Sequence, residues 1–167
     1  MPNEFSLGTV AVALSPRERF EEYLQSRGKR FTQQREILVK HVFSRHEHFD
    51  ADELMDELTR SQGARRVSRP TVYRTLSELV DSGLLRKMQI GSRAVYEHDY
   101  GYPQHDHLHC QQCNQLIEFH SDELKHLRDA VAREHRFRVT GHRFIVTGIC
   151  NDCARKTRRR KRPVDLI

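Results

Sequence analysis

Apolar residues recur at helical spacing in four stretches of the first half of the chain. Each stretch follows a residue that can cap a helix, and Gly28, Gly63 and Gly83 lie where helices would stop. A proline sits in the first turn of the first and fourth stretches, where helices accept it. We therefore predict four helices, which are capped by Ser15, Thr32, Asp50 and Ser68 and whose apolar positions are Phe20, Tyr23 and Leu24; Ile37, Leu38, His41 and Val42; Leu54, Met55 and Leu58; and Val72, Leu76, Leu79 and Val80.

Two segments after the fourth helix alternate between apolar and polar residues, as β-strands do. They span residues 84–89 and 94–97 and flank Ile90-Gly91-Ser92, which favours a hairpin. On the polar side of the fourth helix, Tyr73 lies next to Arg74, a pair that suits contact with a base and a phosphate. Three helices, a recognition helix and a hairpin make a winged helix-turn-helix. The alternative is an ordinary small α+β domain with a solvated basic helix.

The second half of the chain predicts a smaller α/β domain. Gly101 and Pro103 interrupt regular structure in residues 98–104, so we place a boundary near Tyr100. The pattern then predicts strands at 115–119, 137–139 and 144–149 and a helix at 121–135, whose apolar side is formed by Leu124, Leu127 and Val131. The predicted α+β architecture comprises a flexible N-terminus (1–15), a winged-helix domain (16–99), the second domain (100–154) and a basic, disordered tail (155–167).

The positive charge of the chain is concentrated in two places. The 167 residues carry a net charge of +6, and residues 155–167 hold seven basic residues against one acidic residue. Residues 60–93, which include the fourth helix, hold eight basic residues and two acidic ones. Phosphate contact requires clusters of this kind. For the tail, a solvated end and a DNA-contacting arm remain alternatives.

No apolar run approaches the about 20 residues that are needed to span a membrane. Residues 7–14 are apolar but lack the basic start and the length of a signal peptide. We therefore expect a cytoplasmic protein with no membrane partner.

All four cysteines occur in two C-x-x-C pairs, Cys110/Cys113 and Cys150/Cys153. In an intracellular chain this spacing indicates zinc before disulfides, and two such pairs can build one tetrahedral Cys₄ site. The 36 residues between the pairs suit a metal that ties the two ends of a small domain. Two independent redox dithiols are the alternative.

The segment H-D-H-L-H, residues 105–109, precedes the first cysteine pair. If the segment is a strand, His105, His107 and His109 project from one face. Two imidazoles on one face can bind one transition metal ion, whose coordination other residues would complete.

Taken in order, five motifs resemble the ferric uptake regulator family over residues 27–153. They are G-K-R-F-T-Q-Q-R-E-I-L (28–38), H-F-D-A-D-E-L (48–54), R-P-T-V-Y-R-T-L (69–76), H-D-H-L-H-C-Q-Q-C (105–113) and G-I-C-N-D-C (148–153). The resemblance implies a homodimeric, metal-dependent repressor of A·T-rich inverted-repeat operators in double-stranded DNA, with a dimerisation function in the second domain.

The resemblance also implies roles for particular residues. Structural Zn²⁺ would be held by Cys110, Cys113, Cys150 and Cys153, and the regulatory metal by His48, Glu97, His105, His107 and Glu118. The regulatory site would thus span the hinge between the domains. The residues expected to contact DNA are Arg30, Arg69, Thr71, Tyr73 and Arg74.

Some members of the family have a third metal site, and here the match is incomplete. Asp106 and His142 match two of its ligands, but Gln104 stands where a histidine is common and Lys125 where a glutamate is common. Only His120 or His126 is left to substitute for the missing ligands.

The mixed nitrogen and oxygen ligands of the regulatory site favour Fe(II), with Mn(II) or Zn(II) as substitutes. A zinc uptake regulator and a peroxide-responsive repressor of the same fold are the alternatives. Peroxide sensors of the family tend to have Asp at the position of Glu97, which argues against that reading.

Two further classes of protein compete with a regulator. An enzyme with a zinc hydrolase site would leave the basic helix unexplained, and no H-E-x-x-H motif is present, so we expect neither catalysis nor a small organic substrate. A metal-independent architectural DNA-binding protein is the other alternative.

Overall fold

The computed structural model describes residues 10–44, 47–62 and 67–160, which form two compact units. The N-terminal unit lies within residues 9–103, and the C-terminal unit begins at Gln104. No helix within the described ranges is long and apolar enough to cross a membrane. Gly63, the N-terminus before residue 10 and the tail beyond Arg160 lie outside the described residues.

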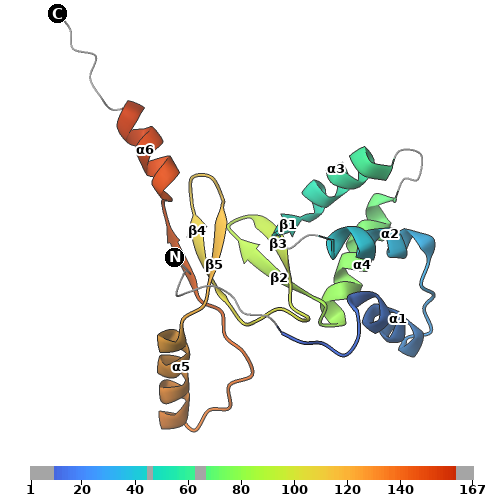
Figure 1. The fold of residues 1–167 in the computed structure, drawn as a ribbon, viewed down its shortest axis with the longest axis horizontal. Helices are drawn as coiled ribbons and strands as arrows, with labels where there is room; N and C mark the ends of the chain where they lie inside the picture. The colour runs from blue at the N-terminus through green and yellow to red at the C-terminus, as the bar shows by residue number, and fades with distance from the viewer. Residues whose placement is uncertain (1–9, 45–46, 63–66, 161–167) are drawn as a thin grey trace, which may run out of the picture. The chain divides into compact units, whose positions relative to one another are not determined.

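The N-terminal unit is a helical bundle with a small antiparallel sheet (Figure 1). The sheet has the strand order β1-β3-β2, and a hairpin connects β2 and β3. Its elements are α1 (Pro16–Ser26), α2 (Gln33–Val42), β1 (Phe49–Asp50), α3 (Ala51–Gln62), α4 (Arg69–Asp81), β2 (Leu85–Ile90) and β3 (Arg93–His98).

The four predicted capping residues begin the four helices. The side chains of Ser15, Thr32 and Ser68 accept hydrogen bonds from the third backbone N–H of α1, α2 and α4. At α3, the carboxylate of Asp50 accepts from the N–H of Glu53 at 2.8 Å, and Glu53 accepts from the N–H of Asp50 at 2.9 Å. Each cap accepts from a backbone N–H that has no partner within the first turn of its helix. The capping residues therefore determine where the helices begin.

Glycine makes the turn that follows α4. Gly83 adopts a φ of +70°, which favours glycine, and Leu84 donates to the carbonyl of Leu79 at 2.9 Å. The chain then enters the predicted hairpin, which closes through Gly91 and Ser92 between the paired residues Ile90 and Arg93. The order of helices and hairpin confirms the predicted winged helix-turn-helix.

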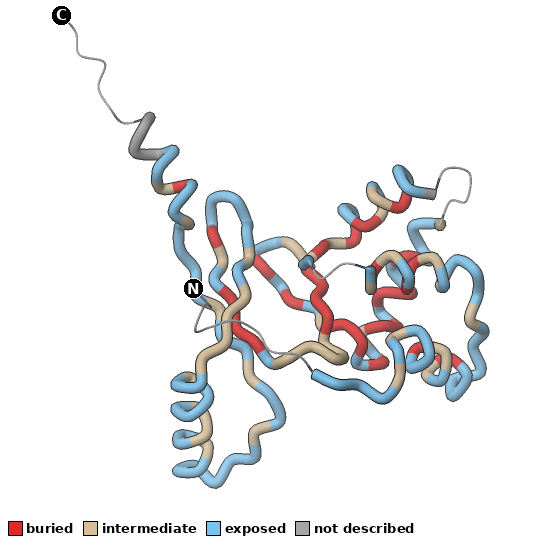
Figure 2. The backbone as a smooth tube through the Cα atoms, in the orientation of Figure 1, coloured by how far each residue is buried: buried red, intermediate tan, exposed pale blue. Residues whose placement is uncertain are grey.

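The core of this unit is built from the predicted apolar faces. Buried side chains concentrate on its helices and sheet (Figure 2). Among them are Phe20, Leu24, Leu38, Val42, Leu54, Leu58, Val72, Leu76 and Leu79. The packing leaves the opposite side of α4, with Tyr73, Arg74 and Ser77, exposed.

One buried carboxylate on α4 holds two cations from the segment before and within α2. The side chain of Glu78 is 5% exposed and accepts two hydrogen bonds from Arg35, at 2.7 and 2.9 Å, and one from Lys29 at 2.8 Å. Arg35 also donates to the carbonyl of Arg30 at 2.6 Å. These bonds fix the recognition helix to the segment before α2, which contains Arg30.

We predict that Glu78→Ala lowers the free energy of unfolding by about 3 kcal/mol, because it leaves a largely buried guanidinium without its counter-charge. Urea denaturation of the full chain measures the change. The control is Glu36→Ala, whose exposed pair with Arg17 at 3.5 Å is worth at most about 0.5 kcal/mol. Equal changes in the two variants would contradict the structural role of Glu78.

The C-terminal unit contains a second three-stranded sheet and two helices. Its strand order is β5-β4-β6, with β5 antiparallel and β6 parallel to the central strand β4. The elements are β4 (Asp106–Cys110), β5 (Leu116–Phe119), α5 (Asp122–Glu134), β6 (Ile145–Gly148) and α6 (Asn151–Arg160).

The predicted fold class, α+β with an α/β second unit, is confirmed, but three details differ. The strand predicted at 137–139 is wrong: no strand forms there, and Phe137 is 70% exposed. Its alternating pattern is local, whereas a strand also needs a partner. Strand β1, which pairs Phe49 with Tyr96, has no counterpart among the predicted strands. Residues 155–160, expected in the disordered tail, continue helix α6.

Candidate metal centres

The register of the second sheet brings the two cysteine pairs together. Cys110 ends β4 and lies beside Gly148 at the end of the parallel strand β6. Two residues later, Cys150 begins the turn into α6, and Cys153 lies in the first turn of that helix. The parallel pairing of β4 and β6 therefore closes the 36-residue gap that separates the pairs in the sequence.

The four sulfur atoms have the spacing of a tetrahedral site. All of them lie within 4.8 Å of one another, and Sγ of Cys113 is 3.8 Å from Sγ of Cys150. Two thiolates on one zinc ion, each about 2.3 Å from it, stand about 3.8 Å apart. The same distance is far longer than the about 2.05 Å of a disulfide bond, and none of these four cysteines forms a disulfide. The donor set thus fits Zn²⁺.

The surroundings shift the pKa values of two of these thiols in opposite directions. The backbone N–H of Cys150 donates to Sγ of Cys110 at 3.3 Å and lowers the pKa of Cys110 to about 6. The neighbouring thiol of Cys150, together with burial, raises the pKa of Cys153 to about 12. Four adjacent thiols cannot all ionise without a cation between them, and a divalent metal supplies that charge.

A second group of ligands lies on β4 and β5. His107 pairs with Glu118 across the two strands, and Nε2 of His105 is 3.7 Å from Oε1 of Glu118. One ligand atom from each of the three residues lies within 4.8 Å of the others. The rings of His105 and His107 are 4.8 Å apart. His109, which alternation places on the same face, is not part of this group. Two imidazoles and a carboxylate form an incomplete set for one transition metal ion.

Two further candidate ligands lie within the N-terminal unit. Nε2 of His48, directly before β1, is 3.3 Å from Oε2 of Glu97 on β3. Glu97 is 3% exposed, and Arg86 approaches its other oxygen at 3.7 Å. Arg86 also donates to Asp99 at 2.5 Å. Arg86 on the paired strand and His48 thus hold the carboxylate of Glu97 from two sides.

The residues that match the third site also come together, but with an unexpected neighbour. Nε2 of His142 is 3.2 Å from Asp106, and Arg128 of α5 donates to Nδ1 of His142 at 2.8 Å. Arg86 and Arg128 are not among the site residues predicted from the sequence. Neither belongs to a motif, and only the strand register and the docking of α5 bring them to their partners.

Most of the residues expected to contact DNA are exposed in the N-terminal unit. Tyr73 and Arg74 are exposed on α4, and Arg30 is exposed before α2. Arg69 donates to Asp52 at 3.0 Å and to the hydroxyl of Tyr73 at 3.5 Å. Thr71 lies half-buried in the first turn, where its hydroxyl contacts Ser68. A helix with such a face fits the major groove of B-DNA.

Fold and ligands together define a winged-helix regulator with a Cys₄ metal site. The protein-family model described as the ferric uptake regulator family matches residues 26–147. The chain belongs to this family of metal-dependent transcriptional regulators. Such regulators are not enzymes, which confirms the prediction from the sequence.

Individual relatives carry different names. The ferric uptake regulation protein of Campylobacter upsaliensis is 32% identical over 141 residues, which cover 84% of this chain and 90% of that protein. The peroxide-responsive repressor PerR of Staphylococcus saprophyticus is 30% identical over 133 residues, which cover 80% and 88%. An iron regulator and a peroxide-responsive repressor thus match this chain at nearly the same identity.

A solved structure supports the fold. The Helicobacter pylori ferric uptake regulator Fur superimposes with a TM-score of 0.77 at 22% sequence identity, covering 88% of this chain and 97% of that one. That protein is described as having three functional metal binding sites. At this identity the likeness shows the fold alone.

We predict that Cys110→Ser loses the zinc and unfolds the C-terminal unit, because the metal contributes folding free energy. His105→Ala, the control directly before the same strand, is expected to keep the zinc and the fold. Zinc content and thermal unfolding followed by circular dichroism measure both. Equal destabilisation by the two substitutions would overturn the division into a structural site and a regulatory site.

Proposed function

We propose that this chain is a homodimeric, cytoplasmic repressor that binds A·T-rich inverted-repeat operators when Fe(II) occupies a site shared by its two units. The ligands would be His48 and Glu97 from the N-terminal unit and His105, His107 and Glu118 from the C-terminal unit. The structural Zn²⁺ would remain in the Cys₄ site whether or not the regulatory metal is bound.

The proposal is supported by the observation that each unit already brings part of the regulatory ligands close together. His48 and Glu97 are 3.3 Å apart in one unit, and the three remaining ligand atoms lie within 4.8 Å in the other. Neither part alone fills the coordination sphere of a transition metal ion, since the two imidazoles and one carboxylate of the C-terminal unit leave positions open. A metal that needs both parts stabilises only the arrangement in which they meet.

This requirement makes the metal a switch. A ligand shifts a conformational equilibrium only by its difference in affinity for the two states, and a shared site creates that difference by construction. The closed arrangement would present the two α4 helices of a dimer to successive major grooves, which inverted-repeat operators require.

The chemistry of the ligands favours iron. Three imidazoles and two carboxylates form a mixed nitrogen and oxygen set, which suits Fe(II) and, as a substitute, Mn(II). The same ligands bind Zn(II), so a zinc uptake regulator is the second candidate. Glu97 stands where peroxide sensors tend to have Asp, and peroxide sensing is therefore the third.

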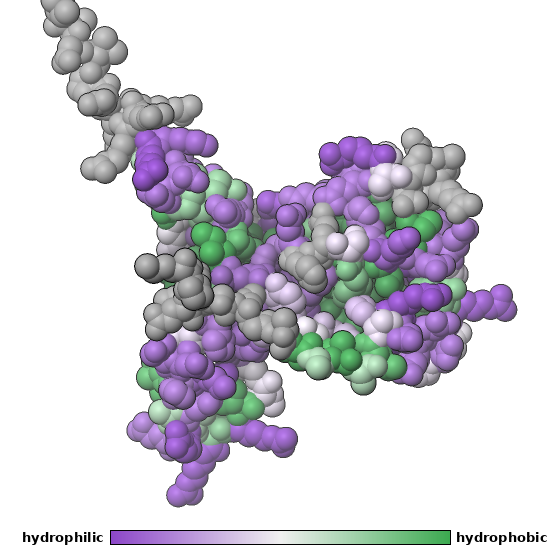
Figure 3. Space-filling model, viewed as in Figure 1, coloured by the Kyte–Doolittle hydropathy of each residue, from purple (hydrophilic) through white to green (hydrophobic). Residues whose placement is uncertain are grey.

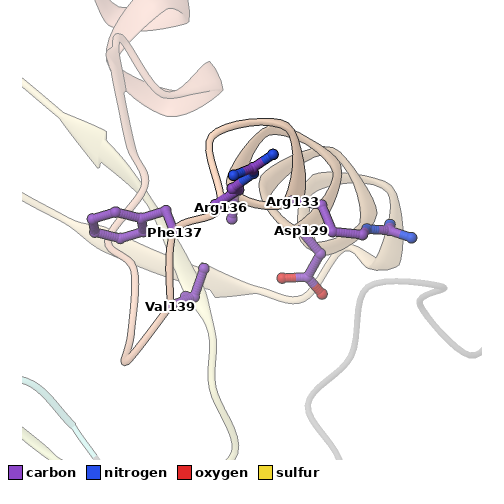
Figure 4. Close-up of a pocket in the computed structure, with 6 residues that line it drawn as sticks. Asp129, Arg133, Arg136, Phe137 and Val139 are labelled. Carbon is purple, nitrogen blue, oxygen red and sulfur yellow. The ribbon is translucent and has the colours of Figure 1, made fainter.

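The C-terminal unit carries the surface that a dimer would bury. None of the residues of α5 is buried, and Leu127 and Val131 on its apolar side are 62% and 49% exposed. Apolar surface shows among the polar residues of this helix (Figure 3). An open cavity of about 520 Å³ lies between the end of α5 and the following segment, with Asp129 and Phe137 in its lining (Figure 4). Exposed apolar area of this kind marks an interface.

We predict that binding to an A·T-rich inverted repeat requires a divalent metal in addition to the structural zinc. Zinc-loaded protein would be titrated onto the DNA without further metal, and with Fe(II) under anaerobic conditions, Mn(II) or Zn(II). Binding is expected at low Fe(II) or Mn(II) and only at far higher Zn(II). His105→Ala, which keeps the Cys₄ site, is the control and is expected to lose the metal response.

The other outcomes identify the alternatives. A response to Zn(II) at the lowest free concentration would indicate a zinc uptake regulator. Release from DNA by peroxide in the Fe(II) form alone would indicate a peroxide sensor. Binding that is indifferent to every metal would leave an architectural DNA-binding protein and would refute the proposal.

We further predict distinct effects for the two exposed residues of α4. Arg74→Ala should weaken binding to all sequences alike and reduce the slope of log K against log salt by about 0.9, because one phosphate contact is lost. Tyr73→Ala should instead reduce the preference for the operator. Fluorescence anisotropy at several salt concentrations separates the two effects, and an unchanged slope for Arg74→Ala would exclude a phosphate contact.

A further inference from the structure

A chain of hydrogen bonds links α5 to the central strand of the second sheet. Arg128 of α5 donates from Nη1 to Nδ1 of His142 at 2.8 Å. Nε2 of His142 lies 3.2 and 3.4 Å from the two carboxylate oxygens of Asp106, the first residue of β4. Arg128 also binds Asp129 through Nε and Nη2, at 2.8 and 2.7 Å. Asp106 is 3% exposed, so the chain ends on a buried charge.

The direction of these bonds leaves His142 without a free lone pair. A guanidinium group only donates, so Nδ1 of His142 must accept. The ring proton then resides on Nε2, where it faces Asp106. A metal-binding imidazole needs a lone pair directed at the ion, and both nitrogens of His142 are committed elsewhere.

The other residues around this position do not fit a metal either. Lys125 lies one turn before Arg128 on the same side of α5 and brings a second positive charge. Gln104 donates to the backbone carbonyl of His142 at 3.4 Å. The ring nitrogens of His120 face the carbonyl of Gln104 at 3.2 Å and the carboxylate of Asp122 at 3.3 Å. Both partners are acceptors, and a neutral imidazole donates to only one of them. In the described residues, no group of ligand atoms within reach of one ion includes His120.

We propose that the guanidinium of Arg128 takes the place of a third metal ion, so that the chain binds two metal ions where some members of its family bind three. The cation that compensates Asp106 is then a covalent part of α5 and acts through His142. In the described part of the chain, the groups of ligand atoms within reach of one ion include neither Asp106 nor His142.

The replacement has a physical consequence for the C-terminal unit. A metal at this position would tie α5 to the sheet only when the metal is available. The chain of Arg128, His142 and Asp106 makes the same connection at any metal concentration. The only metal to which the C-terminal unit would then respond is the one shared with His48 and Glu97.

The first test is a count of metal ions. The full chain would be saturated with Co(II) or Zn(II), separated from free metal and analysed for metal and protein. Two equivalents are expected for the wild type and for Arg128→Ala, since removing Arg128 alone supplies no ligand. The triple variant Gln104→His, Lys125→Glu, Arg128→Ala restores the common residues at positions 104 and 125 and removes the guanidinium. It should bind a third equivalent, which His142→Ala should remove.

The second test measures how far the hydrogen bond from Arg128 to His142 stabilises the protein. Arg128→Ala should lower the melting temperature by about 3 °C, as expected for the loss of a charge-assisted hydrogen bond of roughly 1 kcal/mol. In a His142→Ala background the same substitution should have little further effect, because the bond is already lost. Arg133→Ala, an exposed arginine of the same helix, is the matched control and should leave the melting temperature unchanged.

Two results would overturn the inference. One is a third equivalent of metal in the wild type that His142→Ala removes. The other is a triple variant that folds but still binds two equivalents. Both are independent of DNA binding, so a failure of the proposed repressor function would show in the operator titration and not in the metal count.

Discussion

The pairing of β4 with a strand on each side is the constraint on which the C-terminal unit depends. On one side, the antiparallel register sets His107 opposite Glu118; on the other, the parallel register sets Cys110 opposite Gly148. A shift of either pairing by one residue would turn the affected side chains to the other face. The ligands of two metal sites are therefore positioned by one set of backbone hydrogen bonds.

Local chemistry explains why so much of the N-terminal unit could be predicted. A capping side chain, an apolar stripe and a stopping glycine act within a few residues, so the four helices follow from Ser15, Thr32, Asp50 and Ser68. The C-x-x-C pairs were equally visible, because two thiols at that spacing face one ion from a single turn. In both cases the interacting residues lie within a few positions of one another in the sequence.

Interactions between distant elements were not visible in the same way. Nothing near Glu78 in the sequence indicates that it binds Arg35 and Lys29, and nothing near Arg128 indicates His142. The segment 137–139 shows the reverse case, a strand-like pattern without a neighbouring strand to complete it. Family resemblance identified Gln104 and Lys125 as departures, but only the structure shows that Arg128 binds His142 beside Asp106.

Helix α6 has a consequence of its own, since its first turn contains Cys153 and the turn before it Cys150. The start of this helix is thus part of the cluster of four thiols. Arg155 and Lys156 follow Cys153 in this helix. Oxidation of the thiols would expel the zinc and release the start of the helix. The Cys₄ site would therefore also hold these two basic residues in place.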